Sequence, residues 1–227
     1  MKYITYSHIG KRNSNEDVVL VKELHPNASL AIIADGMGGY ECGDKAAELV
    51  VNNLETYLSG LNKSIYTKND IENALKKSNL AIKHFNEEKN IKSGATIAAA
   101  IIYKELTQIF WIGDVQIDIF KDTKLSYRTV PHTLIQDLKK QLDVVSIEMI
   151  QKYNHIVTKS ISGKREIIDF GYKEFSNKDY DSLVISSDGV HNCIDTSMLV
   201  NKKISEINNI LELTASDNNS YIVVETN

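Results

Sequence analysis

Apolar residues in this chain follow two different spacings along the sequence. Short apolar or alternating runs bounded by turn residues predict strands, whereas apolar positions three and four residues apart predict amphipathic helices. The predicted strands are Tyr3–Tyr6, Asp17–Val21, Leu30–Ile33, Ala95–Tyr103, Gln108–Ile112, Ile117–Lys121, Leu125–Val130, Asp181–Ser186 and Ser220–Val224. The predicted helices are Gly43–Leu58, Ile71–Phe85, Leu134–Leu142, Ile147–Tyr153 and a segment around Ile204–Leu211.

The predicted strands gather in clusters and so do the predicted helices, without regular βαβ alternation. This order is typical of an α+β protein, with antiparallel sheets and helices outside them. The 227 residues and 42% hydrophobic content suffice for one sizeable core, and linkers, repeats and low-complexity segments are missing. We therefore expect a single domain spanning residues 1–227.

Composition narrows the classes of partner. The formal net charge is −4 and the lysines are interleaved with acids, which argues against nucleic acid. Apolar runs are too short for a membrane span, and the first residues do not resemble a signal peptide, so we expect no membrane association. Cys42 and Cys193 form no paired framework, which favours two buried free thiols and a cytoplasmic location.

Four aspartates stand where an apolar run meets a turn. Asp35 follows LAIIA, Asp114 follows IFWIG, Asp188 follows LVISS, and Asp217 comes just before NNSYIVV. A single Asp-Gly is ordinary turn chemistry, but four such acids can converge at one edge of a sheet. Clustered carboxylates repel one another unless a cation neutralises them, which indicates a shared metal site.

The candidate ligands all offer hard oxygen atoms, and the six histidines are scattered. This donor set favours Mg²⁺ or Mn²⁺ over structural zinc. Arg12 lies close to the acidic pair Glu16 and Asp17, and a guanidinium can hold two phosphate oxygens at once. Spacing alone favours a surface salt bridge for Arg12 over a phosphate contact.

Five motifs in order resemble those of the protein phosphatase 2C family. They are Arg12-Asn13-Ser14-Asn15-Glu16-Asp17, Asp35-Gly36-Met37-Gly38-Gly39, Gly113-Asp114, Ser187-Asp188-Gly189 and Asp217-Asn218. The resemblance extends from Gly10 to Val224. It implies a four-layer α-β-β-α sandwich of two antiparallel sheets flanked by helices, with the metal site at one end.

The resemblance also implies a role for each matched residue. Two Mn²⁺ or Mg²⁺ ions would be held by Glu16, Asp35, the Gly36 carbonyl, Asp188 and Asp217, with Asp35 bridging them. Arg12 would bind phosphate, and Asp17 would support bound water from behind the ligands. The implied reaction is hydrolysis of phosphoserine or phosphothreonine in proteins by in-line attack of a metal-bridging hydroxide.

Some positions depart from the family pattern. Met37 replaces a histidine that some members carry, and Asn192 stands where an acid usually helps Asp114 to hold a third metal. We therefore expect a weak or absent third metal. The core two-metal set is complete.

Two alternatives to a protein phosphatase remain open. One is a pseudophosphatase that serves as a regulatory binding module, and the other is a phosphohydrolase of a small molecule. The complete set of metal and phosphate residues favours an enzyme. The expected partners of that enzyme are phosphorylated proteins and a cognate Ser/Thr kinase, and the expected oligomeric state is a monomer.

Overall fold

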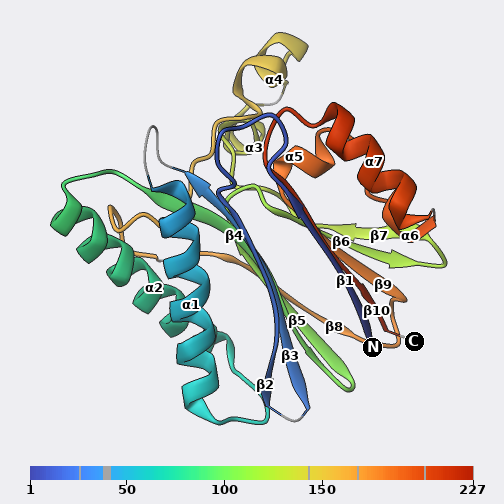
Figure 1. The fold of residues 1–227 in the computed structure, drawn as a ribbon, viewed down its shortest axis with the longest axis horizontal. Coiled ribbons are helices and arrows are strands. Elements are labelled where there is room, and N and C mark those ends of the chain that lie inside the picture. The colour runs from blue at the N-terminus through green and yellow to red at the C-terminus, as the bar shows by residue number, and fades with distance from the viewer. Residues whose placement is uncertain (26, 38–41, 143, 168, 202, 227) are drawn as a thin grey trace.

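Two antiparallel sheets form the centre of the molecule (Figure 1). The computed structural model describes residues 1–25, 27–37, 42–142, 144–167, 169–201 and 203–226. The first sheet has the order β1 (Lys2–His8), β10 (Asn219–Glu225), β9 (Ser182–Ser186), β6 (Gln116–Lys121), β7 (Lys124–Arg128). The second has the order β2 (Asp17–His25), β3 (Ala28–Met37), β4 (Gly94–Tyr103), β5 (Leu106–Ile112), β8 (Gly171–Ser176).

Helices cover the outer faces of both sheets. The second sheet packs against α1 (Gly43–Leu61) and α2 (Lys68–Lys89). The first packs against α5 (Asp188–His191), α6 (Met198–Asn201) and α7 (Ile204–Thr214). Two further helices, α3 (Leu134–Gln141) and α4 (Ile147–Tyr153), project from one end (Figure 1). The predicted four-layer α-β-β-α sandwich is confirmed.

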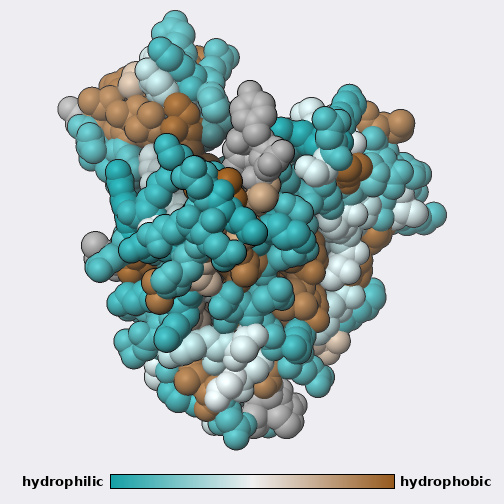
Figure 2. All heavy atoms as spheres, turned by 60° about the vertical axis from the view of Figure 1, so that its left-hand side comes forward, coloured by the Kyte–Doolittle hydropathy of each residue, from teal (hydrophilic) through white to brown (hydrophobic). Residues whose placement is uncertain are grey.

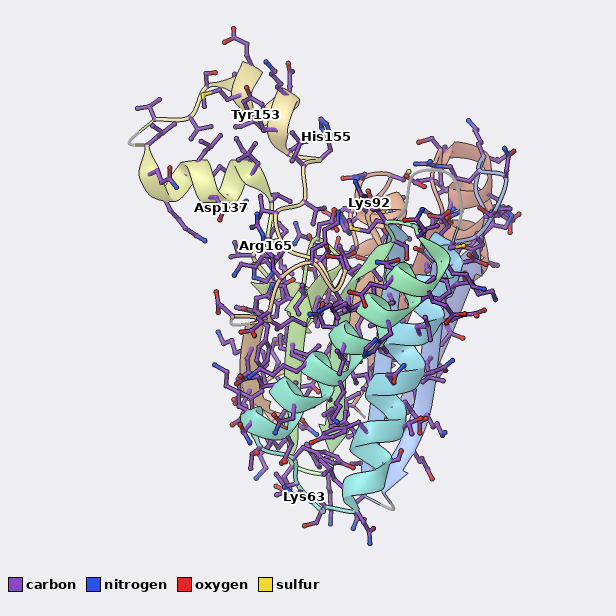
Figure 3. The ribbon with its side chains drawn as sticks, turned by 90° about the vertical axis from the view of Figure 1, so that its left-hand side faces the viewer. Lys63, Lys92, Asp137, Tyr153, His155 and Arg165 are labelled. Atoms are coloured by element: carbon purple, nitrogen blue, oxygen red, sulfur yellow. The ribbon has the colours of Figure 1, made fainter. Side chains whose placement is uncertain are left out.

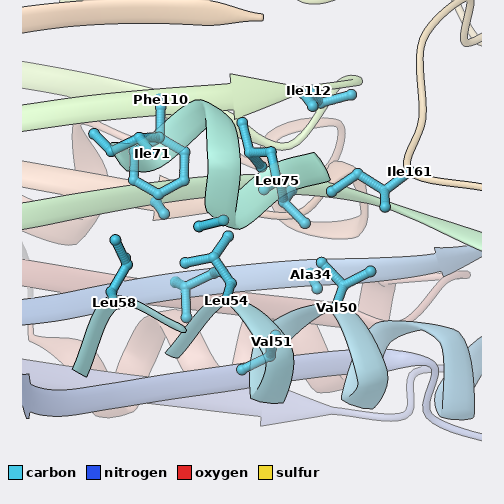
Figure 4. Packing of buried hydrophobic residues seen from close by; sticks show 14 of the residues in the cluster. Ala34, Val50, Val51, Leu54, Leu58, Ile71, Leu75, Phe110, Ile112 and Ile161 are labelled. Carbon is cyan, nitrogen blue, oxygen red and sulfur yellow. The ribbon is translucent and has the colours of Figure 1, made fainter. Parts of the chain in front are cut away.

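The layers explain why the middle of β3 is apolar without a break from Leu30 to Ala34. Along β3, Leu30, Ile32 and Ala34 face the helices, whereas Ala31 and Ile33 lie between the sheets. Successive side chains of a strand point to opposite faces, so a strand covered on both faces needs apolar residues at every position. Figure 4 shows the helix side of this core, where Leu54 of α1 and Leu75 of α2 pack towards the sheet.

Local signals fix the ends of α2. Thr67 and Asp70 form a reciprocal capping box at its start, in which each side chain accepts a hydrogen bond from the other residue's backbone N–H. Asn90 ends the helix in the left-handed conformation with φ 52°. Neither signal depends on the rest of the fold.

Three elements and the cysteines differ from expectation. Strand β8 and the one-turn helices α5 and α6 were not predicted, because β8 is an edge strand with a largely exposed, polar sequence and the helices are too short to show a periodicity. The prediction of two buried thiols is wrong. Both thiols are free, but Cys193 is exposed and Cys42 is only half-buried.

The segment that carries α3 and α4 exposes unusually many apolar side chains. Val144 is 81% exposed and Ile147 is 74% exposed. Figure 2 shows the resulting brown patch on the projecting part of the molecule. Within the described residues, no helix combines the length and hydrophobicity needed to cross a membrane.

Candidate metal and phosphate site

The antiparallel topology places the predicted acids at one end of the sandwich. In the second sheet, Asp17 begins β2 and pairs with Asp35 near the end of β3. In the first sheet, β9 ends at Ser186, just before Asp188, and β10 begins just after Asp217. Ser186 pairs with Tyr221, so these two chain reversals also lie at the same end. The α3–α4 segment projects from this end in Figure 1.

Asp35 lies at the electrostatic centre of the group. Burial is the main cause that raises the pKa of its carboxyl well above the usual range, and the negative charges of Asp17, Asp188, Asp114 and Asp217 raise it further. The structure therefore brings the predicted acids together around one carboxylate. These residues are far apart in the sequence, since Asp17 lies near the beginning of the chain and Asp217 near its end.

The pKa values of neighbouring carboxylates are raised as well. Burial, followed by the charges of Asp114 and Asp217, raises the pKa of Asp188 to about 7. Burial raises the pKa of Asp17 to about 6, although hydrogen bonds from serine hydroxyls oppose the shift. In a site made of such groups, a bound cation would recover the electrostatic free energy that crowding costs.

Arg12 contributes the positive charge beside this group. Its Nη2 atom lies 2.6 Å from Oδ2 of Asp217, and the Arg12 side chain is 59% exposed. The hydrogen bond to Asp217 is the first cause that raises the pKa of the Arg12 guanidinium. The salt bridge that spacing predicted therefore exists, and its partner is one of the predicted metal ligands. The exposed guanidinium also faces solvent at the edge of the acidic group.

One buried oxygen in the group has no partner. Oδ2 of Asp17 accepts a hydrogen bond from the Ser187 hydroxyl at 2.8 Å. Oδ1 of Asp17 is buried and makes no hydrogen bond with the residues that the structure describes. A buried acceptor without a partner is costly, and a water or ion in the site would satisfy it. The supporting role of Asp17 stays a prediction.

Asn218 ties the site together and was not among the predicted site residues. Its Oδ1 atom accepts from the backbone N–H of Glu16 at 2.9 Å. Its Nδ2 atom donates to the carbonyl of Ile9 at 2.9 Å and to that of Ser14 at 2.8 Å. One amide thus fixes the loop that carries Arg12 and Glu16 against the start of β10. Its signal in the sequence was its place in the Asp217-Asn218 motif.

Glycines allow the backbone segments around the ligands to touch. A Cβ atom on Gly36 would lie 2.2 Å from the carbonyl oxygen of Gly43, the first residue of α1. A Cβ atom on Gly43 would in turn lie 2.2 Å from Oε2 of Glu16. Gly36 and Gly43 therefore let the end of β3, the start of α1 and the Glu16 side chain meet. Gly38 and Gly39 of the same motif lie outside the described residues.

The region assigned to a third metal has a fixed aspartate and an exposed amide. The turn before Asp114 is clamped by His132, whose Nδ1 atom accepts from the Gly113 N–H at 3.1 Å. Burial lowers the pKa of His132 to about 4, which keeps the ring neutral and able to accept this bond. Asn192 is exposed and lies one helical turn after Asp188, whose carbonyl accepts from the Asn192 N–H at 2.9 Å.

The donor set fits a hard divalent cation. Its members are carboxylates that repel one another, with Asp17 Oδ1 still lacking a partner. Among the described residues, however, no three His, Cys, Asp or Glu side chains already converge closely enough to hold one ion. Asp217 is instead drawn to Arg12. The carboxylates are the kind of ligand that a hard divalent cation takes, and the two-metal site stays a prediction at this point.

Comparison with known proteins identifies the family. The family model described as protein phosphatase 2C matches residues 4–219. Protein phosphatase PhpP of Streptococcus pneumoniae is 29% identical over 205 residues, which cover 87% of this chain and 81% of that protein. The chain thus belongs to the protein phosphatase 2C family of metal-dependent protein serine/threonine phosphatases.

Solved structures of bacterial phosphatases share the fold. Serine/threonine phosphatase Stp1 from Staphylococcus aureus superposes with a TM-score of 0.85 at 20% identity, covering 99% of this chain and 94% of that one. The catalytic domain of PstP, solved in complex with two manganese ions, gives a TM-score of 0.78 at 20% identity, with 99% and 97% covered. At these identities the likeness concerns the fold.

We predict that Asp188→Asn stabilises the metal-free protein at high pH. The folded-state pKa of Asp188 is about 7, well above its unfolded value of about 3.9, so its ionisation opposes folding increasingly as pH rises between these values. Asparagine resembles the protonated acid at every pH. In the presence of a chelator, thermal unfolding should give the variant a melting temperature equal to wild type near pH 4 and several degrees higher at pH 8.

Asp181→Asn is the matched control for this measurement. The Asp122 N–H and Lys121 lower the pKa of Asp181, so neutralising it should reduce stability at pH 8. A melting temperature of Asp188→Asn that is equal to or below wild type at pH 8 would contradict the crowded-carboxylate interpretation.

Proposed function

We propose that Glu16, Asp35, the Gly36 carbonyl, Asp188 and Asp217 hold two Mn²⁺ or Mg²⁺ ions. The observation that carries this proposal is the gathering of Asp17, Asp188, Asp114 and Asp217 around Asp35, whose carboxyl pKa is raised well above the usual range first by burial and then by these four charges. The PstP catalytic domain, which shares this fold, was solved in complex with two manganese ions, and this supports the metal and its number. When bound, such ions would supply a hydroxide nucleophile and offset phosphoryl charge, as the predicted in-line hydrolysis requires.

The substrate that we propose is a phosphoserine or phosphothreonine side chain of a protein. Arg12 is the residue of this chain that would hold the phosphate, because its exposed guanidinium stands at the edge of the acidic group. To do so it would have to exchange the Asp217 carboxylate for phosphate oxygens, and Asp217 would then be free to bind a metal ion. One movement would thus couple loading of the metal to opening of the phosphate site.

Asn218 and Asp17 would serve this site without contacting the substrate. Asn218 holds the Arg12–Glu16 loop in place through three hydrogen bonds to its backbone and that of Ile9. Asp17 would orient water through its unpartnered Oδ1 atom. A cytoplasmic location, a cognate Ser/Thr kinase and a monomeric state stay predictions from the sequence.

The proposal is tested by hydrolysis of p-nitrophenyl phosphate and of phosphoserine peptides with and without Mn²⁺. We expect activity that a chelator abolishes and that Mn²⁺ restores. Asp35→Asn should reduce kcat by more than the roughly 10–100-fold that loss of an outer-shell partner costs, because it removes the central anionic ligand. Preference for phosphopeptides would separate a protein phosphatase from a small-molecule phosphohydrolase.

Asp179→Asn provides the control for this loss. Asp179 is exposed beside the start of β9, at the opposite end of that strand from Asp188. The Asp179→Asn variant should retain full activity. If Asp35→Asn were as active as Asp179→Asn, the two-metal assignment would be wrong.

Arg12→Lys should mainly raise KM for a phosphopeptide. Lysine keeps the positive charge but cannot hold two phosphate oxygens with one planar group. We expect KM to rise several-fold while the Mn²⁺ concentration for half-maximal activity moves little. Unchanged KM and kcat would show that Arg12 does not bind the phosphate and only forms the salt bridge with Asp217.

Asn192→Asp should strengthen a third metal site next to Asp114. An amide oxygen can bind Mn²⁺ but adds no negative charge, so the substitution should lower the half-maximal Mn²⁺ concentration or raise kcat. Asp114→Ala should cost more activity in the Asn192→Asp background than in wild type. Identical metal titrations of wild type and Asn192→Asp would show that the missing acid has no consequence.

A further inference from the structure

A groove with a volume of about 580 Å³ opens beside the candidate metal site. Met37, Gly94 and Ile112 form part of its wall, at the ends of β3, β4 and β5. Met37 is two residues from Asp35, and Ile112 is two residues from Asp114. The groove and the acidic group are therefore built on the same strand ends, and a chain that reaches the metal site passes close to the groove.

The groove is lined by cations in a chain whose overall charge is negative. Lys92, Lys164 and Arg165 are exposed and line it together. They make no salt bridge with any residue that the structure describes. Figure 3 shows Lys92 and Arg165 on one face of the molecule, below the projecting α3–α4 segment.

The acids of the groove do not cancel this charge. Asp169 is paired with Lys159, whose Nζ atom lies 2.6 Å from its Oδ2 atom. Glu166 is the other acid in the lining, so three cations without salt-bridge partners face one carboxylate. The groove thus offers positive charge next to a site whose own protein groups are mainly negative.

Resting on the proposed phosphatase function, we propose that this groove binds acidic side chains that flank the phosphorylated residue. Lys92, Lys164 and Arg165 place positive charge along the groove, and this charge would attract the carboxylates of a peptide rich in Asp or Glu. The apolar side chains of Met37 and Ile112 in the groove wall can pack against the peptide backbone and the aliphatic parts of its side chains. The substrate class is therefore a phosphoprotein segment with carboxylates near the phosphate.

Arg165 has the guanidinium that is most clearly available to a ligand. The chain contains only three arginines, and the other two hold carboxylates, Arg12 that of Asp217 and Arg128 that of Asp118. The side chain of Arg165 makes no hydrogen bond or ion pair within the described part of the chain, while its carbonyl accepts from Asn79 Nδ2 at 2.9 Å. The backbone is fixed and the guanidinium is left available in the groove.

The test compares three phosphoserine peptides that differ only in the flanking residues, three Glu, three Ala or three Lys on each side. For wild type, kcat/KM should be highest with Glu, and the advantage should shrink as salt rises. The triple variant Lys92→Glu, Lys164→Glu, Arg165→Glu should lower the Glu-to-Ala ratio of kcat/KM at least fivefold and favour the Lys peptide. A ratio unchanged by the triple variant would overturn the proposal.

Lys104→Glu is the matched control. Lys104 is exposed just after Tyr103, at the end of β4 opposite Gly94, and makes no salt bridge within the described residues. Lys104→Glu has the same change of charge as each single groove substitution, and it should leave the Glu-to-Ala ratio as in wild type. If Lys104→Glu lowered the ratio as much as one groove substitution does, the effect would be one of net charge and the groove would not be the binding site.

A binding measurement separates this proposal from the proposed catalysis. A fluorescent Glu-flanked peptide with Asp in place of phosphoserine is titrated with each protein in Mn²⁺, and anisotropy reports its Kd. The triple variant should bind it at least fivefold more weakly than wild type and Lys104→Glu do. Equal Kd values for wild type and the triple variant would overturn the groove proposal even if the enzyme hydrolyses phosphoserine peptides. Weaker binding by the triple variant, in a protein that hydrolyses no phosphoserine peptide, would support the groove and refute the phosphatase function.

Discussion

The crowding of carboxylates with little access to water is the constraint on which the rest of this structure depends. The pKa of Asp35 is raised most clearly, first by desolvation and then by the charges of four other aspartates. The sandwich tolerates this cost because two apolar sheets and their covering helices supply the stability elsewhere. The repulsion also favours metal binding, because the electrostatic free energy that a cation relieves contributes to the affinity of the site for that cation.

The fold could be predicted wherever burial dictates every residue of an element. Strand β4 is buried along its whole length, and α1 shows its apolar face at regular spacing, so both are visible in the sequence. Strand β8 could not be predicted in the same way. It is an edge strand whose register comes from pairing with β5, and its residues are half-buried or exposed, without a strong apolar face.

The site divides along a similar line. Asp35 and Asp188 are visible because each ends an apolar run next to a glycine, a pattern that a single sequence displays. The role of Asn218 is invisible there, because its three partners lie about 200 residues away along the chain. The pairing of Arg12 with Asp217 was equally hidden. Spacing predicted a salt bridge, but only the antiparallel pairing of β1 with β10 brings that carboxylate within reach.

The three arginines show how one residue type meets three electrostatic needs. Arg128 binds the buried Asp118 through two hydrogen bonds of 2.8 and 2.9 Å and so neutralises a charge that the core could not otherwise hold. Arg12 binds the carboxylate of Asp217, which is one of the predicted metal ligands. Arg165 makes no ion pair within the described residues, and its charge in the groove is therefore available to a ligand. A negative site beside a positive groove would favour a substrate that brings phosphate to the metals and carboxylates to the lysines and Arg165.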